Sequence, residues 1–192
     1  MDLTTKDVNG WHIADNPGVY QPATTNNFEF VIHDIDNLLK AGVDEATADA
    51  EDYLYGGQET IRLAVNKATA PHFTQNEITI NRGNTKTYFA GAIEYSEEPI
   101  DVIDYVGRSG KSVLMAWQRL SGDAKSGAVG NASEYKKTCE LIEYTPSYEK
   151  VRSWILVGCW VKGLSENDFN HEQNDKKVVT ATIRYDRAYP ND

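Results

Sequence analysis

The chain has 192 residues, which is long enough for one domain with a full core and short for two. Its hydrophobic content of 40% and aromatic content of 10% are those of a globular protein and exclude a disordered one. The 19 basic and 29 acidic residues give a net charge of −10, which disfavours direct binding to a phosphate backbone, and no apolar run approaches the length of a transmembrane helix.

Residues 1–26 are polar and show no sustained hydrophobic period, so we expect an extended N-terminal arm that needs another surface to lie against. The stretch NNFEFVIHD that follows alternates Phe28, Phe30 and Ile32, which predicts a half-buried strand. Residues 35–57 are rich in alanine and acids and are expected to form a surface insertion. We therefore predict a single β domain over 27–188, followed by a C-terminal tail at 189–192.

Two strand patterns follow the insertion. Residues 59–68 place Ile61, Leu63 and Val65 on one side of a predicted strand, with polar or small residues on the other. Residues 76–97 contain two strand patterns around Gly83-Asn84, which predicts a β-hairpin.

One stretch, 108–121, predicts a helix, with Val113, Leu114, Trp117 and Leu120 on one face and Ser109 as its N-cap. We expect Trp117 to be a core residue. Further strand patterns cover 136–145, 151–161 and 177–188. About seven strands and one helix predict a mainly β fold, an antiparallel sandwich or barrel with one flanking α-helix.

The stretch GRSGKS at 107–112 resembles a phosphate-binding loop. That loop needs the spacing G-x-x-x-x-G-K-[ST], because six residues are required to wrap the phosphates. Counting back from Gly110, the first glycine should stand where the chain has Tyr105. The spacing therefore rejects a nucleotide site, and a mainly β fold would not provide the parallel sheet such a loop requires.

Other candidate sites are equally incomplete. Asp168, Asn170 and Glu172 are spaced like the start of a calcium loop, but the sixth and twelfth positions are Gln173 and Val179. The four histidines are far apart in sequence. The acids between positions 94 and 104 could serve glycoside hydrolysis, although a solvated edge is the simpler interpretation. We expect no catalytic residue, metal or cofactor, and we expect Cys139 and Cys159 to be buried free thiols.

Several ordered motifs do carry a resemblance. They are Tyr135-Lys136-Lys137 on one strand, Glu143-Tyr144 at its end, Gly158-Cys159-Trp160 on the next, and Tyr185-Asp186 near the last. Upstream, NNFEFVI, VNKATAP, NRGNTKTYFAG and MAWQRL follow in matching order. This set, over roughly 26–188, resembles the tail tube protein of contractile-tailed bacteriophages, although Val161 stands where many relatives have proline.

The resemblance implies the tail-tube fold, assembled as hexameric rings that stack into a hollow tube for genome ejection. Each subunit would give four strands to an inner barrel. We expect ring contacts from residues of the arm and the insertion: Trp11, Tyr20, Leu38, Leu39, Tyr53 and Tyr55. We expect the lumen to be lined by Thr60, Arg62, Ala64, Asn66, Glu77, Thr79 and Asn81.

The implied partners are further copies of the chain, the tail sheath, tape measure, baseplate and tail terminator proteins, and DNA only as transiting cargo. The subunit would be a virion structural protein, not an enzyme, assembled in the bacterial host cytoplasm without binding a membrane. Two alternatives stay open: a ring subunit of a type VI secretion or contractile toxin tube, and a β-sandwich carbohydrate-active enzyme.

Overall fold

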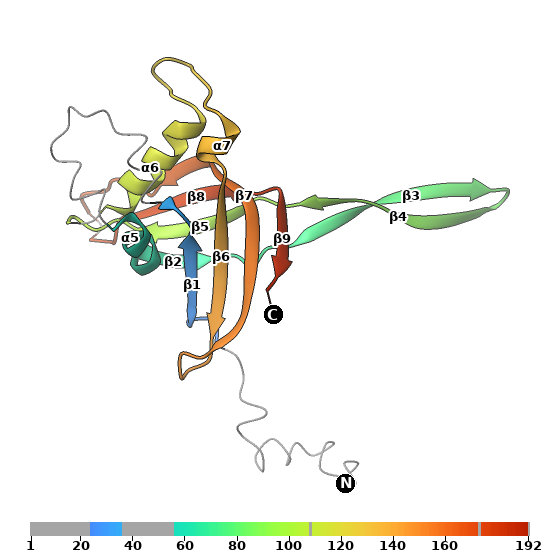
Figure 1. The fold of residues 1–192 in the computed structure, drawn as a ribbon, viewed down its shortest axis with the longest axis horizontal. Coiled ribbons are helices and arrows are strands. Elements are labelled where there is room, and N and C mark those ends of the chain that lie inside the picture. Colours follow the sequence, from blue (N-terminus) through green and yellow to red (C-terminus); the bar gives the residue numbers. More distant parts are fainter. Residues whose placement is uncertain (1–23, 36–55, 108, 173, 192) are drawn as a thin grey trace, which may run out of the picture.

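The computed structural model describes residues 24–35, 56–107, 109–172 and 174–191. A mainly β body carries one long hairpin that projects away from it (Figure 1). The strands are β1(Phe28–Ile32), β2(Val65–Ala68), β3(Phe73–Arg82), β4(Thr85–Tyr95), β5(Glu98–Ile103), β6(Lys137–Tyr144), β7(Lys150–Glu166), β8(Val178–Arg184) and β9(Arg187–Pro190). The helices are α5(Gly57–Ala64), α6(Gly110–Ser121) and α7(Ala132–Tyr135). The mainly β fold that we predicted is confirmed.

The body is one antiparallel sheet in the order β1-β6-β7-β8-β5-β2, with β9 also paired to β7. The 17-residue strand β7 connects the two halves of this sheet, because its first part pairs with β6 and β9 and its last part pairs with β8. A register shift between Val161 and Gly163 lies in the last part. In Figure 1 the strands of the first half run steeply across those of the second, so the sheet folds over on itself.

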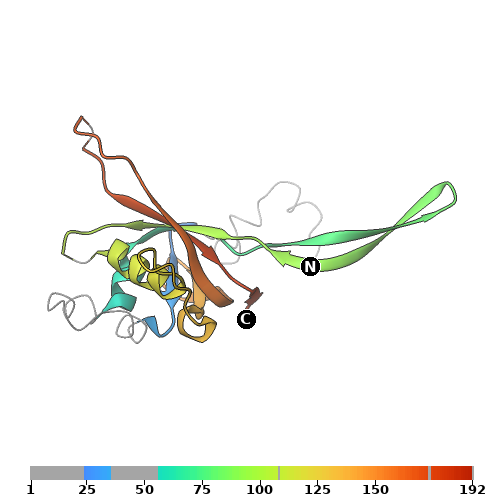
Figure 2. The same cartoon turned by 90° about the horizontal axis from the view of Figure 1, so that it is seen from above.

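Helix α6 closes the core on one side of the sheet (Figures 1 and 2). Its Val113, Leu114 and Trp117 are buried, and Leu120 packs against them half-buried, as the helical spacing predicted. The indole Nε1 of Trp117 donates a hydrogen bond to the carbonyl oxygen of Tyr135 at 2.7 Å. Trp117 is therefore a core residue whose one polar atom is satisfied, as a buried tryptophan requires.

The N-terminus of α6 is capped as expected, and it also holds a carboxylate. Ser109 Oγ accepts a hydrogen bond from the backbone N–H of Ser112 at 3.1 Å. Oδ1 of Asp104 accepts from the Ser109 hydroxyl at 2.7 Å and from the backbone N–H of Lys111 at 3.4 Å. An acidic side chain is favourable here because of the helix dipole. The GRSGKS stretch thus directs the Lys111 N–H and the Ser109 hydroxyl to the chain's own Asp104.

Residues 57–64 form helix α5, so the strand predicted from residue 59 was wrong at its start. Ile61 and Ala64 are buried while Leu63 is 70% exposed, which is helical spacing rather than alternation. Only β2, from Val65 onward, has the extended backbone that we expected. A short stretch with apolar side chains at positions 61, 63 and 65 fits either a helical or a strand period. The packing of α5 against β1 favours the helix.

Smaller differences lie near the end of the chain. The loop expected before residue 135 contains the short helix α7. The last predicted strand is divided into β8 and β9, and residues 189 and 190, assigned to a C-terminal tail, pair with β7 in β9. The two cysteines are buried free thiols, as predicted, and burial raises the pKa of the Cys139 thiol.

The motifs that carried the resemblance converge in space. The rings of Tyr135 and Trp160 meet edge to face at 6.1 Å between centroids. Lys136 Nζ donates to both carboxylate oxygens of Asp186, at 2.9 and 2.7 Å. Gly158, with φ of +74°, lies directly against that carboxylate. The motif is therefore a packing unit that joins α7, β7 and the turn after β8.

Candidate assembly surface

The hairpin β3–β4 forms a separate two-stranded sheet that extends away from the body (Figure 2). Every residue of β3 is exposed, and so are all but two of the eleven in β4. Its turn at Gly83-Asn84 is the one the sequence predicted, with Gly83 in the left-handed region at φ of +60°. An isolated two-stranded hairpin is at best marginally stable in water, so this element is built to lie against another surface.

The two faces of the hairpin differ in chemistry. Ile78 pairs with Phe89 and Ile80 with Thr87, so Ile78, Ile80 and Phe89 share one side, which we call the apolar face. These three side chains are 53%, 42% and 52% exposed. Three exposed apolar side chains side by side are a mark of an interaction site rather than of scattered surface residues.

The opposite side, the polar face, carries Glu77, Thr79 and Asn81 from β3 together with Lys86 and Tyr88 from β4. Thr79 Oγ1 donates to Glu77 Oε1 at 2.8 Å within this face. Glu77, Thr79 and Asn81 are three of the residues that we expected to line a lumen, and the structure places them together on one exposed surface. Their facing a lumen stays a prediction.

A bulge interrupts the hairpin between its tip and its base. From Glu77 to Gln75 the strand β3 advances two residues while its partner advances three, from Ala90 to Ile93. Gly91 lies at this point, where an added Cβ would come within 2.6 Å of the Asn76 carbonyl oxygen. Only glycine allows the two backbones to approach this closely, so the bulge sets the twist of the hairpin.

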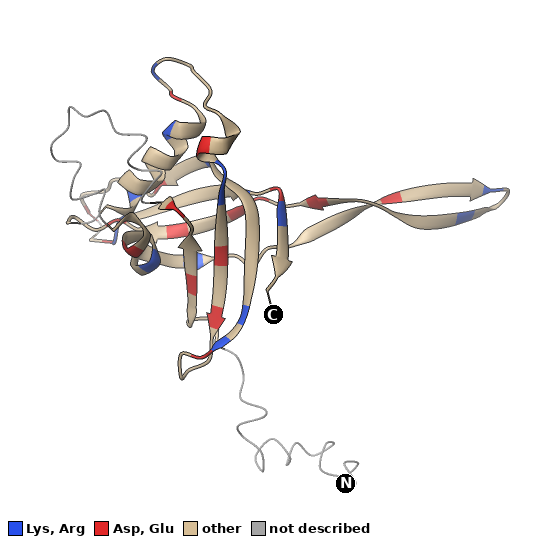
Figure 3. Ribbon diagram, viewed as in Figure 1, with Lys and Arg blue, Asp and Glu red and all other residues tan. Residues whose placement is uncertain are grey.

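Charge is also distributed unevenly along the hairpin. Arg82 and Lys86 flank the turn, so the tip is basic, whereas Glu77 and Glu94 lie farther toward the body (Figure 3). The chain as a whole carries −10. The tip of the hairpin therefore carries a charge opposite in sign to the net charge of the chain.

At the base of the hairpin, aromatic rings and one ion pair join it to the body. The ring centroids of Phe73 and Tyr95 are 6.0 Å apart, and those of Tyr95 and Tyr185 are 5.8 Å apart. His72 Nδ1 lies 2.7 Å from Oε1 of the buried Glu98. Burial raises the pKa of the Glu98 carboxyl, and the nearby His72 opposes that shift. Burial also raises the pKa of Tyr185, to about 12.

The remaining predicted lumen residues lie on α5 and β2, apart from the hairpin. Ala64 is buried in the core, so the prediction that it faces a lumen was wrong. Nε of Arg62 pairs with Glu29 Oε1 on β1, and Glu29 Oε2 accepts from the Tyr144 hydroxyl at 2.9 Å. Thr60 is half-buried and Asn66 is exposed. The predicted ring contacts Trp11, Tyr20, Leu38, Leu39, Tyr53 and Tyr55 lie outside the described residues.

The acids between 94 and 104 do not converge on one point, because each has its own structural partner. Glu94 accepts from Asn76, Glu97 from Lys162, Glu98 faces His72, Asp101 accepts from Thr180 and Asp104 from Ser109. Among the residues that the structure describes, no three His, Cys, Asp or Glu side chains are grouped as metal ligands would be. A pair of carboxylates flanking a substrate is not formed by this stretch.

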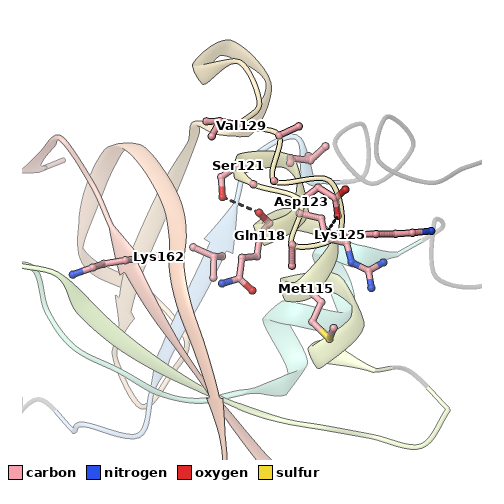
Figure 4. Close-up of a pocket in the computed structure, with 14 residues that line it drawn as sticks. Met115, Gln118, Ser121, Asp123, Lys125, Val129 and Lys162 are labelled. Atoms are coloured by element: carbon pink, nitrogen blue, oxygen red, sulfur yellow. Dashed lines mark hydrogen bonds between the residues drawn. The ribbon is translucent and has the colours of Figure 1, made fainter.

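A pocket of about 930 Å³ lies between the end of α6, the loop 122–129 and β7 (Figure 4). Its polar groups are used within the loop. Asp123 accepts from the backbone N–H groups of Lys125 and Ser126 and from the Ser126 hydroxyl, and these bonds lower the pKa of Asp123. Ser121 Oγ donates to the Gln118 carbonyl at 2.8 Å. No nucleophile and base face each other in this pocket.

Sequence reasoning located the hairpin and its polar face but missed the apolar face and the base. The sequence analysis assigned no role to Ile78 and Ile80, because alternation along a strand does not show what covers its apolar side. His72 and Glu98 carried no signal, since they are 26 residues apart and only the closing of the hairpin brings them together. No helix in the described ranges is long and apolar enough to cross a membrane.

No protein-family model and no curated protein sequence matches the chain. Solved structures do match. A chain of the PVC extracellular contractile injection system, from its sheath/tube terminator in the extended state, is 12% identical, with 91% of this chain and 99% of that chain covered and a TM-score of 0.61. A chain of the PVC sheath-tube complex is 16% identical, with 94% and 96% covered and a TM-score of 0.60. A chain of the anti-feeding prophage tube terminating cap is 13% identical, with 89% and 91% covered and a TM-score of 0.62. The chain therefore has the phage-like tail-tube fold that these contractile injection system proteins share.

Proposed function

We propose that this chain is a structural subunit whose hexameric rings stack into the inner tail tube of a contractile phage tail, the conduit for genome ejection. One observation carries the proposal. The fold presents a two-stranded hairpin with an apolar face, Ile78, Ile80 and Phe89, that nothing in the described chain covers. Its cover is a second copy of the chain, because the basic tip beside Arg82 and Lys86 complements an acidic neighbour.

The two faces of the hairpin suggest how it would be oriented. With the apolar face on a neighbouring copy, the polar face of Glu77, Thr79 and Asn81 would point to a water-filled lumen, as the strands of a wet barrel do. Pairing of the hairpin with neighbouring strands would also remove its exposed edges. Asn66 and Arg62 would lie farther from the tip of the hairpin, on the body of the subunit. A lumen of this kind is polar and not basic, so DNA would pass without being bound.

The proposed partners follow from the same role. They are further copies of the chain in rings, then the tail sheath, tape measure, baseplate and tail terminator proteins. The similar solved structures support this class of partner, since they come from a sheath-tube complex, a sheath/tube terminator and a tube terminating cap. The subunit would reach the virion tail after assembly in the host cytoplasm.

The test uses two neighbouring aromatic residues on opposite faces. Phe89→Ala removes an aromatic ring from the apolar face, and Tyr88→Ala removes one of similar exposure, 59% against 52%, from the polar face. We expect the full-length protein to form rings and tubes in negative-stain electron micrographs, Phe89→Ala to stay unassembled, and Tyr88→Ala to assemble. Circular dichroism should show both variants folded. A wild-type protein that stays a monomer at high concentration would contradict the proposal.

A second candidate is a ring subunit of a contractile toxin or secretion tube. It is favoured by two of the similar structures, which come from an extracellular contractile injection system. Purifying the assembled particle from producing cells separates the two roles. A tail joined to a head with nuclease-protected DNA indicates a phage, whereas a headless particle loaded with protein indicates an injection system.

A further inference from the structure

The base of the hairpin is a hinge built from a few atoms. The carbonyl oxygen of His72 accepts hydrogen bonds from the Ser96 backbone N–H and from the Tyr185 hydroxyl, both at 3.4 Å. Ser96 directly follows β4 and Tyr185 directly follows β8, so this one oxygen joins both ends of the hairpin to the sheet. Both bonds are long, and a small movement of the His72 backbone would break them.

The side chain of His72 makes a further attachment, in addition to the ring contacts of Tyr95. Its Nδ1 lies 2.7 Å from Oε1 of Glu98, within ion-pair distance, and that buried oxygen accepts no hydrogen bond from the described residues. The His72 side chain is 59% exposed, whereas that of Glu98 is 5% exposed. A buried carboxylate therefore depends on a histidine that solvent protons can reach directly.

We propose that His72 and Glu98 form a proton-dependent latch that fixes the β3–β4 hairpin to the sheet at mildly acidic pH and releases it as the pH rises. Histidine is the side chain that changes charge between about pH 5 and 8. Protonated His72 supplies the charge that the buried carboxylate needs. Neutral His72 leaves a buried anion without a counter-charge, which is costly in the protein interior.

Burial raises the pKa of the Glu98 carboxyl, and the nearby His72 opposes that shift by stabilising the carboxylate. The latch requires an ionised Glu98 facing a protonated His72, because a neutral carboxyl needs no counter-charge. Loss of the His72 proton is therefore the event that releases the latch.

Other ionisable groups around the latch do not replace His72. They are Tyr95 on β4, Glu97 with its partner Lys162 on β7, Cys159 on β7, and Arg184 and Tyr185 at the end of β8. Lys162 Nζ lies 2.6 Å from Glu97 Oε2, so that cation is already paired. Tyr185, whose pKa is raised to about 12, stays neutral over the range in which histidine titrates. His72 is thus the group of this cluster that supplies the counter-charge to Glu98.

Hydrogen exchange at the hinge tests the latch directly. The full-length protein is exchanged at several pH values from 5.5 to 8.0, and mass spectrometry follows a peptide that contains Ser96, with rates divided by the intrinsic rate at each pH. We expect protection of this peptide to fall roughly tenfold across the range, which corresponds to about 1.4 kcal/mol, because the ion pair that holds His72 beside the buried Glu98 is lost.

Two variants and one control decide the outcome. His72→Gln and Glu98→Gln should each show protection that does not change with pH. His33→Gln should behave like the wild type, because His33 is paired with Glu140 at 3.7 Å on the far part of the sheet. Constant protection in the wild type, or an undiminished pH dependence in His72→Gln, would overturn the latch.

A consequence for assembly rests on the proposed function. If the hairpin must be held at a fixed angle to meet a neighbouring copy, sedimentation should show more assembly at pH 6 than at pH 8 in the wild type and no such difference in His72→Gln. Exchange that changes with pH while sedimentation does not would retain the latch and refute its control of assembly. A protein that never assembles would refute the proposed function and leave the exchange result standing.

Discussion

Removing the indole of Trp117 is the sharpest test of how α6 holds the body together. Trp117 is fully buried, and its Nε1 donates at 2.7 Å to the carbonyl oxygen of Tyr135, next to α7. The helix therefore uses one side chain both to fill the core and to fix the position of the segment before β6. Trp117→Ala removes both functions, and Trp117→Phe removes mainly the hydrogen bond.

The expected losses follow from these two contributions. Truncating a large buried aromatic to alanine costs about 3–5 kcal/mol of unfolding free energy. Leaving the Tyr135 carbonyl without its donor adds about 1–3 kcal/mol. We therefore expect about 4–6 kcal/mol for Trp117→Ala, with the parts not fully additive, and about 1–3 kcal/mol for Trp117→Phe. The larger loss is a substantial part of the roughly 5–15 kcal/mol that stabilises a typical domain.

Urea unfolding followed by far-ultraviolet circular dichroism measures these differences at a concentration where no assembly occurs. Arg119→Ala is the matched control, since Arg119 is exposed on the same helix two residues away and should change stability by no more than about 0.5 kcal/mol. The reasoning is refuted if Trp117→Ala unfolds at the same urea concentration as the wild type, or if Trp117→Phe is as damaging as Trp117→Ala.

Four further outcomes are expected. Gly158→Ala should lower the melting temperature because φ is +74° and Asp186 occupies the space of the new Cβ, whereas Gly163→Ala on the same strand, with nothing within 4 Å, should change it little. The pKa of Tyr185 is raised to about 12 in the folded chain, so the stability that its protonated form contributes is present below pH 10 and is lost between about pH 10 and 12. Tyr185→Phe should remove this loss from the dependence of unfolding free energy on pH. Deleting residues 1–20 should leave a folded protein that forms no long tubes in electron micrographs, and unimpaired tubes would rule out an assembly role for the arm. Assembled tubes should show no appreciable affinity for double-stranded DNA at moderate salt in a filter-binding assay, and strong retention would contradict a non-basic lumen.

Local patterns in the sequence were sufficient for the parts of the fold that depend on local chemistry. The hairpin was visible from Gly83-Asn84 between two strand patterns, and α6 from the spacing of Val113 and Trp117 behind a serine cap. Both features are decided within about twenty residues. The mainly β class followed from the number of strand patterns, and the tail-tube fold from the order of the motifs.

Features decided by distant partners could not be obtained in the same way. Helix α5 was mistaken for a strand because Ile61, Leu63 and Val65 also alternate, and only contact with β1 and β5 selects the helical face. The exposure of the apolar face of the hairpin could not be predicted, since alternation shows that one side of a strand is apolar and not which molecule covers it. The pairing of His72 with Glu98 requires the hairpin to close first.

The order in which the sheet is assembled has a consequence for synthesis on the ribosome. Strand β1 pairs with β6, and the Tyr144 hydroxyl donates a hydrogen bond to Glu29, which is 115 residues away in the sequence. At translation rates of about 5–20 residues per second, β1 waits on the order of 10 s for its partner to emerge. During that time the apolar Phe30 and Ile32, which are buried in the folded protein, lack their strand partners. The β3–β4 hairpin, which lies between β1 and β6 in the sequence, can already close from local contacts. The nascent chain can thus form the β3–β4 hairpin before its core is complete. A chaperone would matter most during the interval before β1 joins β6.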